Sequence, residues 1–262
     1  MSKIRFFTII VLLLASGIYW IFAGKKTYPL PTSAYYVNDY ADVLMIATRS
    51  SIAREGERLY SVTEDTELGG TQVVFATFKV ENLSGIADYD KTDIYREWKI
   101  GENDMGVLVL FFFEENSSEE PQLVETQIEV GYRMEEFLTP AELGRMVDSS
   151  INNEDYNWFL DLSVANLLYQ ILEEIYVEAY DYESFNYDMD NYYDYLLDYE
   201  IDEVYDTEPM SLFDYFFSYN ALISDQLFFF VPIASFVLFG GYGIFRAGGG
   251  KSGGMGVFRR RR

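Results

Sequence analysis

The longest charge-free apolar stretches of the chain lie near its two ends. Phe6–Ala23 contains 18 residues and Leu227–Phe245 contains 19, and neither includes an ionisable Lys, Arg, Asp or Glu. At 1.5 Å per residue, 18 helical residues extend about 27 Å, close to the hydrocarbon thickness of a bilayer. The pattern therefore predicts two membrane-spanning segments, the second within residues 226–246.

The first stretch has two interpretations. Ala15 and Gly17 have the small side chains typical of a signal-peptide cleavage site, but the apolar run continues to Ala23 before Lys25 and Lys26 end it. Residues 1–26 are therefore a signal anchor or a signal peptide, and the length of the run favours a retained anchor.

Between these stretches the apolar pattern alternates between helical and strand periods. Met105–Phe113 is a continuous apolar run, typical of a central strand covered on both faces. Leu123–Val130 alternates with a period of two, and Leu162–Ile175 repeats at helical spacing. The full prediction is of helices at 42–65, 88–98, 139–150 and 156–176, with strands at 72–80, 105–113 and 123–130. This order predicts an α/β fold, a small mixed sheet with helices on both faces.

Composition divides the remaining chain. Residues 27–35 contain two prolines and form a linker, and residues 36–177 carry the α/β pattern. Residues 178–225 hold 14 acids and ten tyrosines without any Lys or Arg. We interpret them as an acidic, partly helical stalk that covers the sheet or leads to the membrane, with a partner-docking or cation-attracting surface as the alternative. Residues 247–262 form a Gly-rich linker that ends in an arginine cluster.

Charge sets the expected topology. All 43 acids lie within residues 27–225, which hold nine Lys and Arg and carry a net charge of −34. The flanks carry only positive charges, and positive flanks stay in the cytoplasm. We therefore expect a cell-membrane protein with two spans, an extracytoplasmic domain and a cytoplasmic C-terminus. An anionic domain should not bind nucleic acid, so the expected partners are membrane lipid and a membrane protein or a second copy.

The absence of Cys and His narrows the chemistry further. Disulfides, thiolate nucleophiles and Ser-His-Asp triads are excluded. Acids in loops at strand ends remain, and such side chains suit a hard cation such as Ca²⁺ or Mg²⁺. Solvated turn acids are the alternative, and no organic cofactor is expected.

Several ordered motifs resemble the TPM-domain family, which includes thylakoid acid-phosphatase-like proteins, photosystem-II-repair proteins and bacterial membrane proteins. The resemblance covers about Tyr36–Tyr176. It rests on the motifs Tyr36-Val-Asn-Asp-Tyr-Ala-Asp-Val-Leu44, Trp98-Lys-Ile-Gly101, Asp104-Met-Gly-Val-Leu-Val-Leu110 and Ile128-Glu-Val-Gly-Tyr132. Many bacterial members share this layout of exported N-terminus, domain, membrane span and Gly-rich tail.

The resemblance implies an α/β/α sandwich and a carboxylate-lined site at which some members bind calcium, with weak phosphatase activity claimed for some. The carboxylates carried over as metal ligands are Asp39, Asp42, Asp104, Glu129 and Glu135. Arg133 stands where the family usually has a second Gly, and Pro140 where it usually has an Asp. A guanidinium added and an acid lost should both lower the affinity for a cation.

Three functions follow from these features. A non-enzymatic accessory protein that holds partners at the outer membrane surface is preferred, because it fits the two anchors and the altered motifs. A metal-dependent phosphatase is the second, and the net charge of −34 disfavours it by repelling phosphate esters. The third is a subunit of a larger membrane complex, with close helix contact at Gly240, Gly241 and Gly243.

Overall fold

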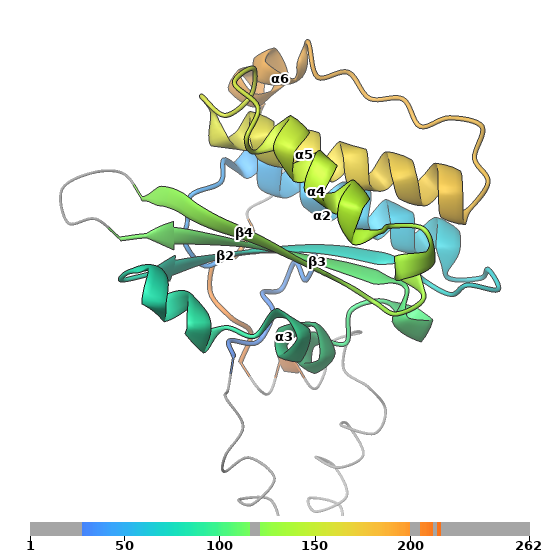
Figure 1. The fold of residues 1–262 in the computed structure, drawn as a ribbon, viewed down its shortest axis with the longest axis horizontal. Helices are drawn as coiled ribbons and strands as arrows, with labels where there is room; N and C mark the ends of the chain where they lie inside the picture. The colour runs from blue at the N-terminus through green and yellow to red at the C-terminus, as the bar shows by residue number, and fades with distance from the viewer. Residues whose placement is uncertain (1–27, 116–120, 200–204, 212–213, 216–262) are drawn as a thin grey trace, which may run out of the picture. The chain divides into compact units, whose positions relative to one another are not determined.

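The computed structural model describes residues 28–115, 121–199, 205–211 and 214–215 (Figure 1). Both predicted membrane stretches and the basic tail lie outside these residues. Within the described ranges, no helix is both long enough and apolar enough to cross a bilayer. The chain divides into two units, Met1–Pro209 and Met210–Arg262, and the fold below is that of the first.

A four-stranded mixed sheet forms the centre of this unit. Its order is β1 (Val37–Asp39), β2 (Gln72–Val80), β3 (Gly106–Glu114) and β4 (Gln122–Val130). The first three strands are parallel and β4 is antiparallel to β3. The predicted α/β class with a small mixed sheet is confirmed.

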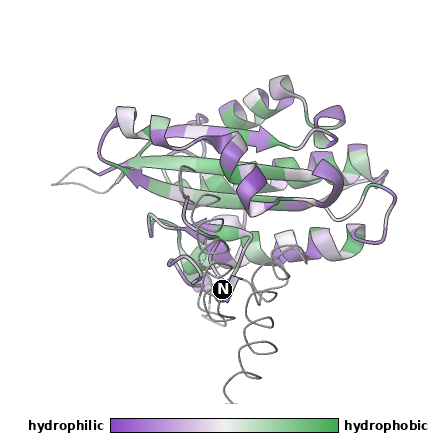
Figure 2. Cartoon of the chain, turned by 90° about the horizontal axis from the view of Figure 1, so that it is seen from below, coloured by the Kyte–Doolittle hydropathy of each residue, from purple (hydrophilic) through white to green (hydrophobic). Residues whose placement is uncertain are grey.

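Helices cover both faces of the sheet, as the apolar run in β3 requires. One face carries α2 (Ile46–Thr63), α4 (Pro140–Ser150) and α5 (Leu160–Glu174), and the other carries α3 (Lys91–Trp98) (Figure 1). Figure 2 shows the apolar residues concentrated along the strands between these layers. Alternate residues of β3 point to the two cores, so Val107 and Val109 face α5 while Leu108 and Leu110 face α3.

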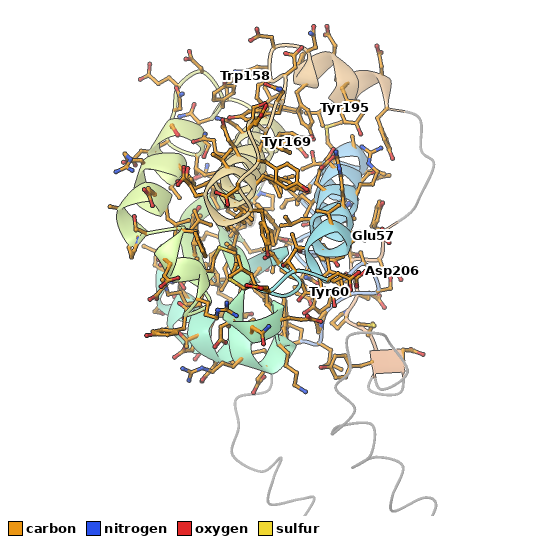
Figure 3. The ribbon with its side chains drawn as sticks, turned by 90° about the vertical axis from the view of Figure 1, so that its right-hand side faces the viewer. Glu57, Tyr60, Trp158, Tyr169, Tyr195 and Asp206 are labelled. Atoms are coloured by element: carbon orange, nitrogen blue, oxygen red, sulfur yellow. The ribbon has the colours of Figure 1, made fainter. Side chains whose placement is uncertain are left out.

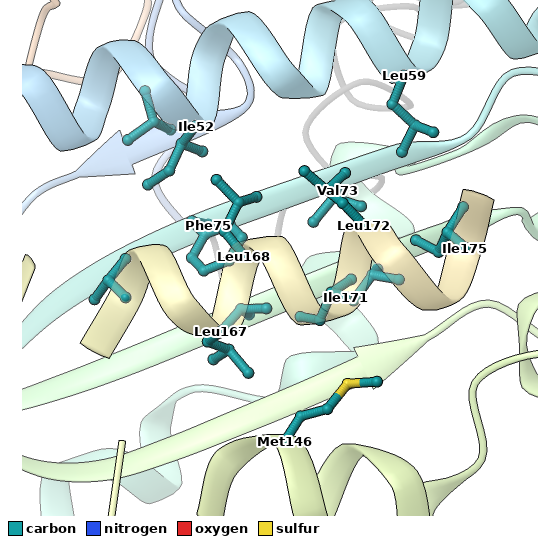
Figure 4. Packing of buried hydrophobic residues seen from close by; sticks show 14 of the residues in the cluster. Ile52, Leu59, Val73, Phe75, Met146, Leu167, Leu168, Ile171, Leu172 and Ile175 are labelled. Carbon is teal, nitrogen blue, oxygen red and sulfur yellow. The ribbon is translucent and has the colours of Figure 1, made fainter. Parts of the chain in front are cut away.

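The larger core lies between the sheet and α2, α4 and α5. Ile52 and Leu59 from α2, and Val73 and Phe75 from β2, pack against the inner face of α5 (Figure 4). These side chains are almost completely removed from water. The helical repeat read from the sequence of α5 is therefore the face that holds this layer on the sheet.

Several predicted boundaries need correction. The first predicted helix begins at Ile46 rather than at 42, because Asp42 has a left-handed φ of 49°. The second was predicted from residue 88 but begins at Lys91, where the Asp90 carboxylate caps its first turn. Asp88 belongs instead to the preceding 3₁₀ helix, Leu83–Asp88. The last begins at Leu160 and passes after Glu174 into a π-helical turn, Ile175–Ala179.

Within the described residues, the acidic extension contributes a short helix that packs on other helices. This helix, α6 (Tyr192–Asp198), lies against α2 and α5, where Tyr192 and Leu196 are buried. The Tyr192 hydroxyl donates to Ser51 Oγ at 3.0 Å and the Tyr199 hydroxyl to Ser50 Oγ at 2.8 Å. These two tyrosines belong to the segment that the sequence predicted as a stalk, and they form part of an outer layer over α2 and α5.

Candidate functional site

Asp39 lies at the carboxyl end of β1 and is almost fully buried. Its Oδ1 accepts hydrogen bonds from Thr77 Oγ1 at 2.6 Å and from the Val43 amide at 3.2 Å. Its Oδ2 accepts one from the Leu44 amide at 3.0 Å. The carboxylate therefore closes the turn that leads from β1 into α2.

Arg49 joins Asp39 to Asp42. Its Nη1 atom lies 3.7 Å from Asp39 Oδ2 and 3.5 Å from Asp42 Oδ1. The Arg49 side chain is 11% exposed, whereas that of Asp42 is 69% exposed. A cation of the protein itself thus already lies between the first two predicted ligands.

A second buried acid, Asp161 of α5, caps the same turn. Its Oδ1 accepts a hydrogen bond from the Met45 amide at 2.8 Å, so the start of α2 is held from two separate segments of the chain. Burial raises the pKa of Asp161 above its ordinary value, and the nearby charge of Asp39 acts in the same direction.

Replacing Asp161 by Asn should therefore change how stability depends on pH. Between pH 3.8, the ordinary value, and the raised pKa, the folded protein keeps a proton that the unfolded chain has released, so rising pH favours unfolding. The amide oxygen of the substituted side chain can still accept from Met45, and no proton is involved. We expect the Asp161→Asn variant to become more stable relative to the unaltered chain as pH rises from about 4 to about 7. Denaturant titration measures the free energy of unfolding of both proteins. Parallel curves would contradict this.

Asp104 and Glu129 lie on the other side of the sheet, around the hydroxyl of Tyr95. Tyr95 belongs to α3 and is 6% exposed, and among the described residues its hydroxyl has no hydrogen-bond partner. Burial raises the pKa of Tyr95, and the charges of Asp104 and Glu129 raise it further. A Cβ at Gly131 would overlap both this hydroxyl and the Asp104 carbonyl oxygen, so Gly131 is what lets these segments approach.

Glu129 is held by two residues at the start of α3. Its Oε1 accepts a hydrogen bond from Thr92 Oγ1 at 2.7 Å, and its Oε2 lies 3.2 Å from Lys91 Nζ. Lys91 Nζ also donates to the Ile128 carbonyl oxygen at 2.6 Å. As with Asp39, hydrogen-bond donors of the protein already surround this carboxylate.

Glu135 and Arg133 follow β4 in a short 3₁₀ segment, Met134–Glu136 with Arg133 before it. Glu135 is exposed, and its amide donates to the Gly131 carbonyl oxygen at 3.1 Å. Arg133 Nη1 donates to the Leu68 carbonyl oxygen at 3.4 Å. The guanidinium that departs from the family motif therefore contacts the turn before β2.

The five predicted ligands divide into two groups. Asp39 lies on the edge strand β1 and shares a face with Thr77, whereas Glu129 lies on the opposite edge strand β4 and faces α3. Three strand spacings, about 14 Å, separate these edges. Asp42 belongs to the group of Asp39, and Asp104 belongs to the group of Glu129. Glu135 lies in the short 3₁₀ segment that follows β4.

This arrangement is a poor fit to a divalent cation. Ca²⁺ takes about six to eight oxygen ligands, and no three carboxylates among the described residues are grouped so that they can hold one ion. The group around Tyr95 offers Asp104 and Glu129, with the Lys91 ammonium already beside Glu129.

Sequence reasoning missed the partners of these carboxylates. Arg49, Lys91 and Asp161 were not singled out, because each contacts its carboxylate or amide partner only in the folded chain. One signal was available: Arg and Lys are scarce in residues 27–225, so each of the nine is a candidate partner for a buried acid.

Residues 37–157 match the family model of the TPM domain. The matched region begins at β1, includes all five predicted carboxylates and ends before α5. No curated protein matches the chain.

Proposed function

This chain carries a TPM domain at residues 37–157, which places it in the TPM-domain family, and we propose that it acts as a non-enzymatic accessory protein of a membrane complex. In this proposal the two apolar stretches anchor the chain in the cell membrane. The TPM domain lies outside the cytoplasm and holds or assembles a membrane-protein partner, while the basic C-terminus stays inside. The charge distribution of the sequence supports this topology.

One observation carries the non-enzymatic assignment. The carboxylates expected to line a catalytic metal site are divided between opposite faces of the sheet, and Asp39 and Glu129 serve the fold. Asp39 closes the turn before α2, and Glu129 holds the first turn of α3 against β4. Side chains used in this way are not available to polarise a phosphoryl group or to activate water.

A metal-dependent phosphatase is the alternative, and the Tyr95 hydroxyl favours it. A buried hydroxyl without a partner usually has a reason, and this one lies beside two carboxylates. The net charge of −34 in residues 27–225 opposes this alternative, because it repels a free phosphate ester.

Purification of the full-length chain from its own membrane tests the proposal. Under mild detergent and after crosslinking, we expect a defined complex whose mass exceeds that of the chain with its micelle. We also expect no release of phosphate from p-nitrophenyl phosphate with Ca²⁺ or Mg²⁺ above a detergent blank. A monomer with turnover that depends on these ions, and that is lost in Asp104→Ala, would replace the proposal by the phosphatase.

A further inference from the structure

A group of aromatic side chains, in which Trp158 is exposed and Phe159 and Tyr193 are half-buried, lies where the loop before α5 meets α6. The Trp158 ring lies 5.7 Å from that of Phe159 and 5.3 Å from that of Tyr193, measured between ring centroids. Phe159 and Tyr193 also contact each other, at 5.6 Å. We call Trp158, Phe159, Tyr193 and the neighbouring Leu197 the aromatic surface; Figure 3 shows Trp158 at the end of the molecule where α6 lies.

Two members of the aromatic surface are open to solvent, whereas Phe159 and Tyr193 are half-buried against the residues of α5 and α6. Trp158 is 59% exposed and Leu197 is 58% exposed. The Trp158 indole nitrogen donates to the Asp155 carbonyl oxygen at 2.8 Å, which orients the ring without burying it. An exposed, oriented Trp within a set of apolar neighbours is typical of a protein–protein contact.

Carboxylate residues lie close to this surface along the chain. Within α6, Tyr193, Asp194 and Leu197 follow the spacing of one helical face, Asp190 precedes the helix, and Asp155 supplies the carbonyl oxygen that Trp158 contacts. Residues 146–199 contain no Lys or Arg. Arg54 of the packed helix α2 donates a hydrogen bond to the Tyr195 hydroxyl, two residues from Tyr193 and on another face of α6.

We propose that the aromatic surface binds a basic, arginine-containing segment of the partner protein. A guanidinium can stack on the exposed indole while its N–H groups reach Asp155, Asp190 or Asp194, a geometry that an ammonium does not match. A second copy of this chain brings its own excess of negative charge, and anionic lipid is repelled in the same way. This inference rests on the accessory function proposed above and names the chemistry of the partner.

Binding of a fluorescent peptide to the full-length chain in detergent tests the inference. The probe is a peptide of alternating Arg and Ser, compared with the same peptide carrying Lys or Glu, by anisotropy. We expect the Arg peptide to bind more tightly than the Lys peptide and the Glu peptide not to bind. Trp158→Ala should weaken Arg-peptide binding about tenfold. Added vesicles of zwitterionic lipid should not compete.

Two control variants separate this surface from the charge of the whole domain. Tyr132→Ala removes a ring that is 80% exposed at the end of β4, and Asp65→Asn/Glu67→Gln removes two exposed charges from the turn after α2. Both should bind the peptide as the unaltered chain does, whereas Asp190→Asn/Asp194→Asn should bind it less. Equal losses in the two double variants, unchanged binding by Trp158→Ala, or competition by zwitterionic vesicles would overturn the inference.

The accessory function and this surface can fail separately. If Trp158→Ala still purifies in the same complex as the unaltered chain, and binds the peptide equally, the surface is refuted and the function stands. A monomer with ion-dependent turnover refutes the function itself.

Discussion

Replacing Asp39 by Asn is expected to lower the free energy of unfolding by about 3–5 kcal/mol, the usual cost of leaving a buried charge without its partner. Both oxygens of Asp39 accept hydrogen bonds from donors, and Arg49 lies beside one of them. An amide supplies one oxygen and one NH₂ group, so in either orientation a donor would face another donor. The largely buried Arg49 would also lose its buried anion.

Asp42→Asn is the matched control for this prediction. Asp42 approaches the same Arg49 atom but is mostly exposed, and Asn accepts its left-handed φ, so the expected cost is about 1 kcal/mol or less. Denaturant titration in the presence and absence of excess EDTA measures both. A loss for Asp39→Asn that disappears when metals are chelated would show that Asp39 acts as a ligand and not as the closure of a turn.

The layers of the fold could be predicted because their signals are local. The apolar run of β3, the alternation of β4 and the helical repeat of α5 each fix a period within their own residues. β1 could not be predicted in the same way. Its three residues, Val37–Asp39, become a strand only by pairing with Phe75–Thr77, far along the chain.

The site was only partly accessible from sequence for the same reason. The family motifs identified five carboxylates but not the face that each one occupies. That face depends on the strand order and on the position of each residue in its strand. Asp161 lies in a helix whose sequence pattern indicates only an apolar face. Its role depends on a hydrogen bond from the Met45 amide, 116 positions earlier in the chain. Such pairings are properties of the folded chain.

Gly131→Ala carries the second large expected effect, a loss of about 1–3 kcal/mol from overpacking. The added Cβ would overlap the Asp104 carbonyl oxygen and the Tyr95 hydroxyl, and the first of these is backbone and cannot rotate away. Because Gly131 also donates to the Gly106 carbonyl oxygen at 2.9 Å, the strain should spread to the start of β3. Gly144→Ala is the matched control: its Cβ would meet nothing within 4 Å in α4. It should therefore stabilise the chain by about 0.5–1 kcal/mol.

A double-mutant cycle with Tyr95→Phe identifies which contact causes the loss. Removing the buried, unpartnered hydroxyl should not destabilise the chain by itself, and it should relieve part of the Gly131→Ala strain. Relief cannot be complete, because the Asp104 carbonyl oxygen remains in place. Full rescue would mean that the backbone can move, and no rescue would mean that the hydroxyl turns away at little cost. Partial rescue is the result that requires Asp104, Tyr95 and Gly131 to pack as one rigid unit, which is what keeps Asp104 and Glu129 together on this face.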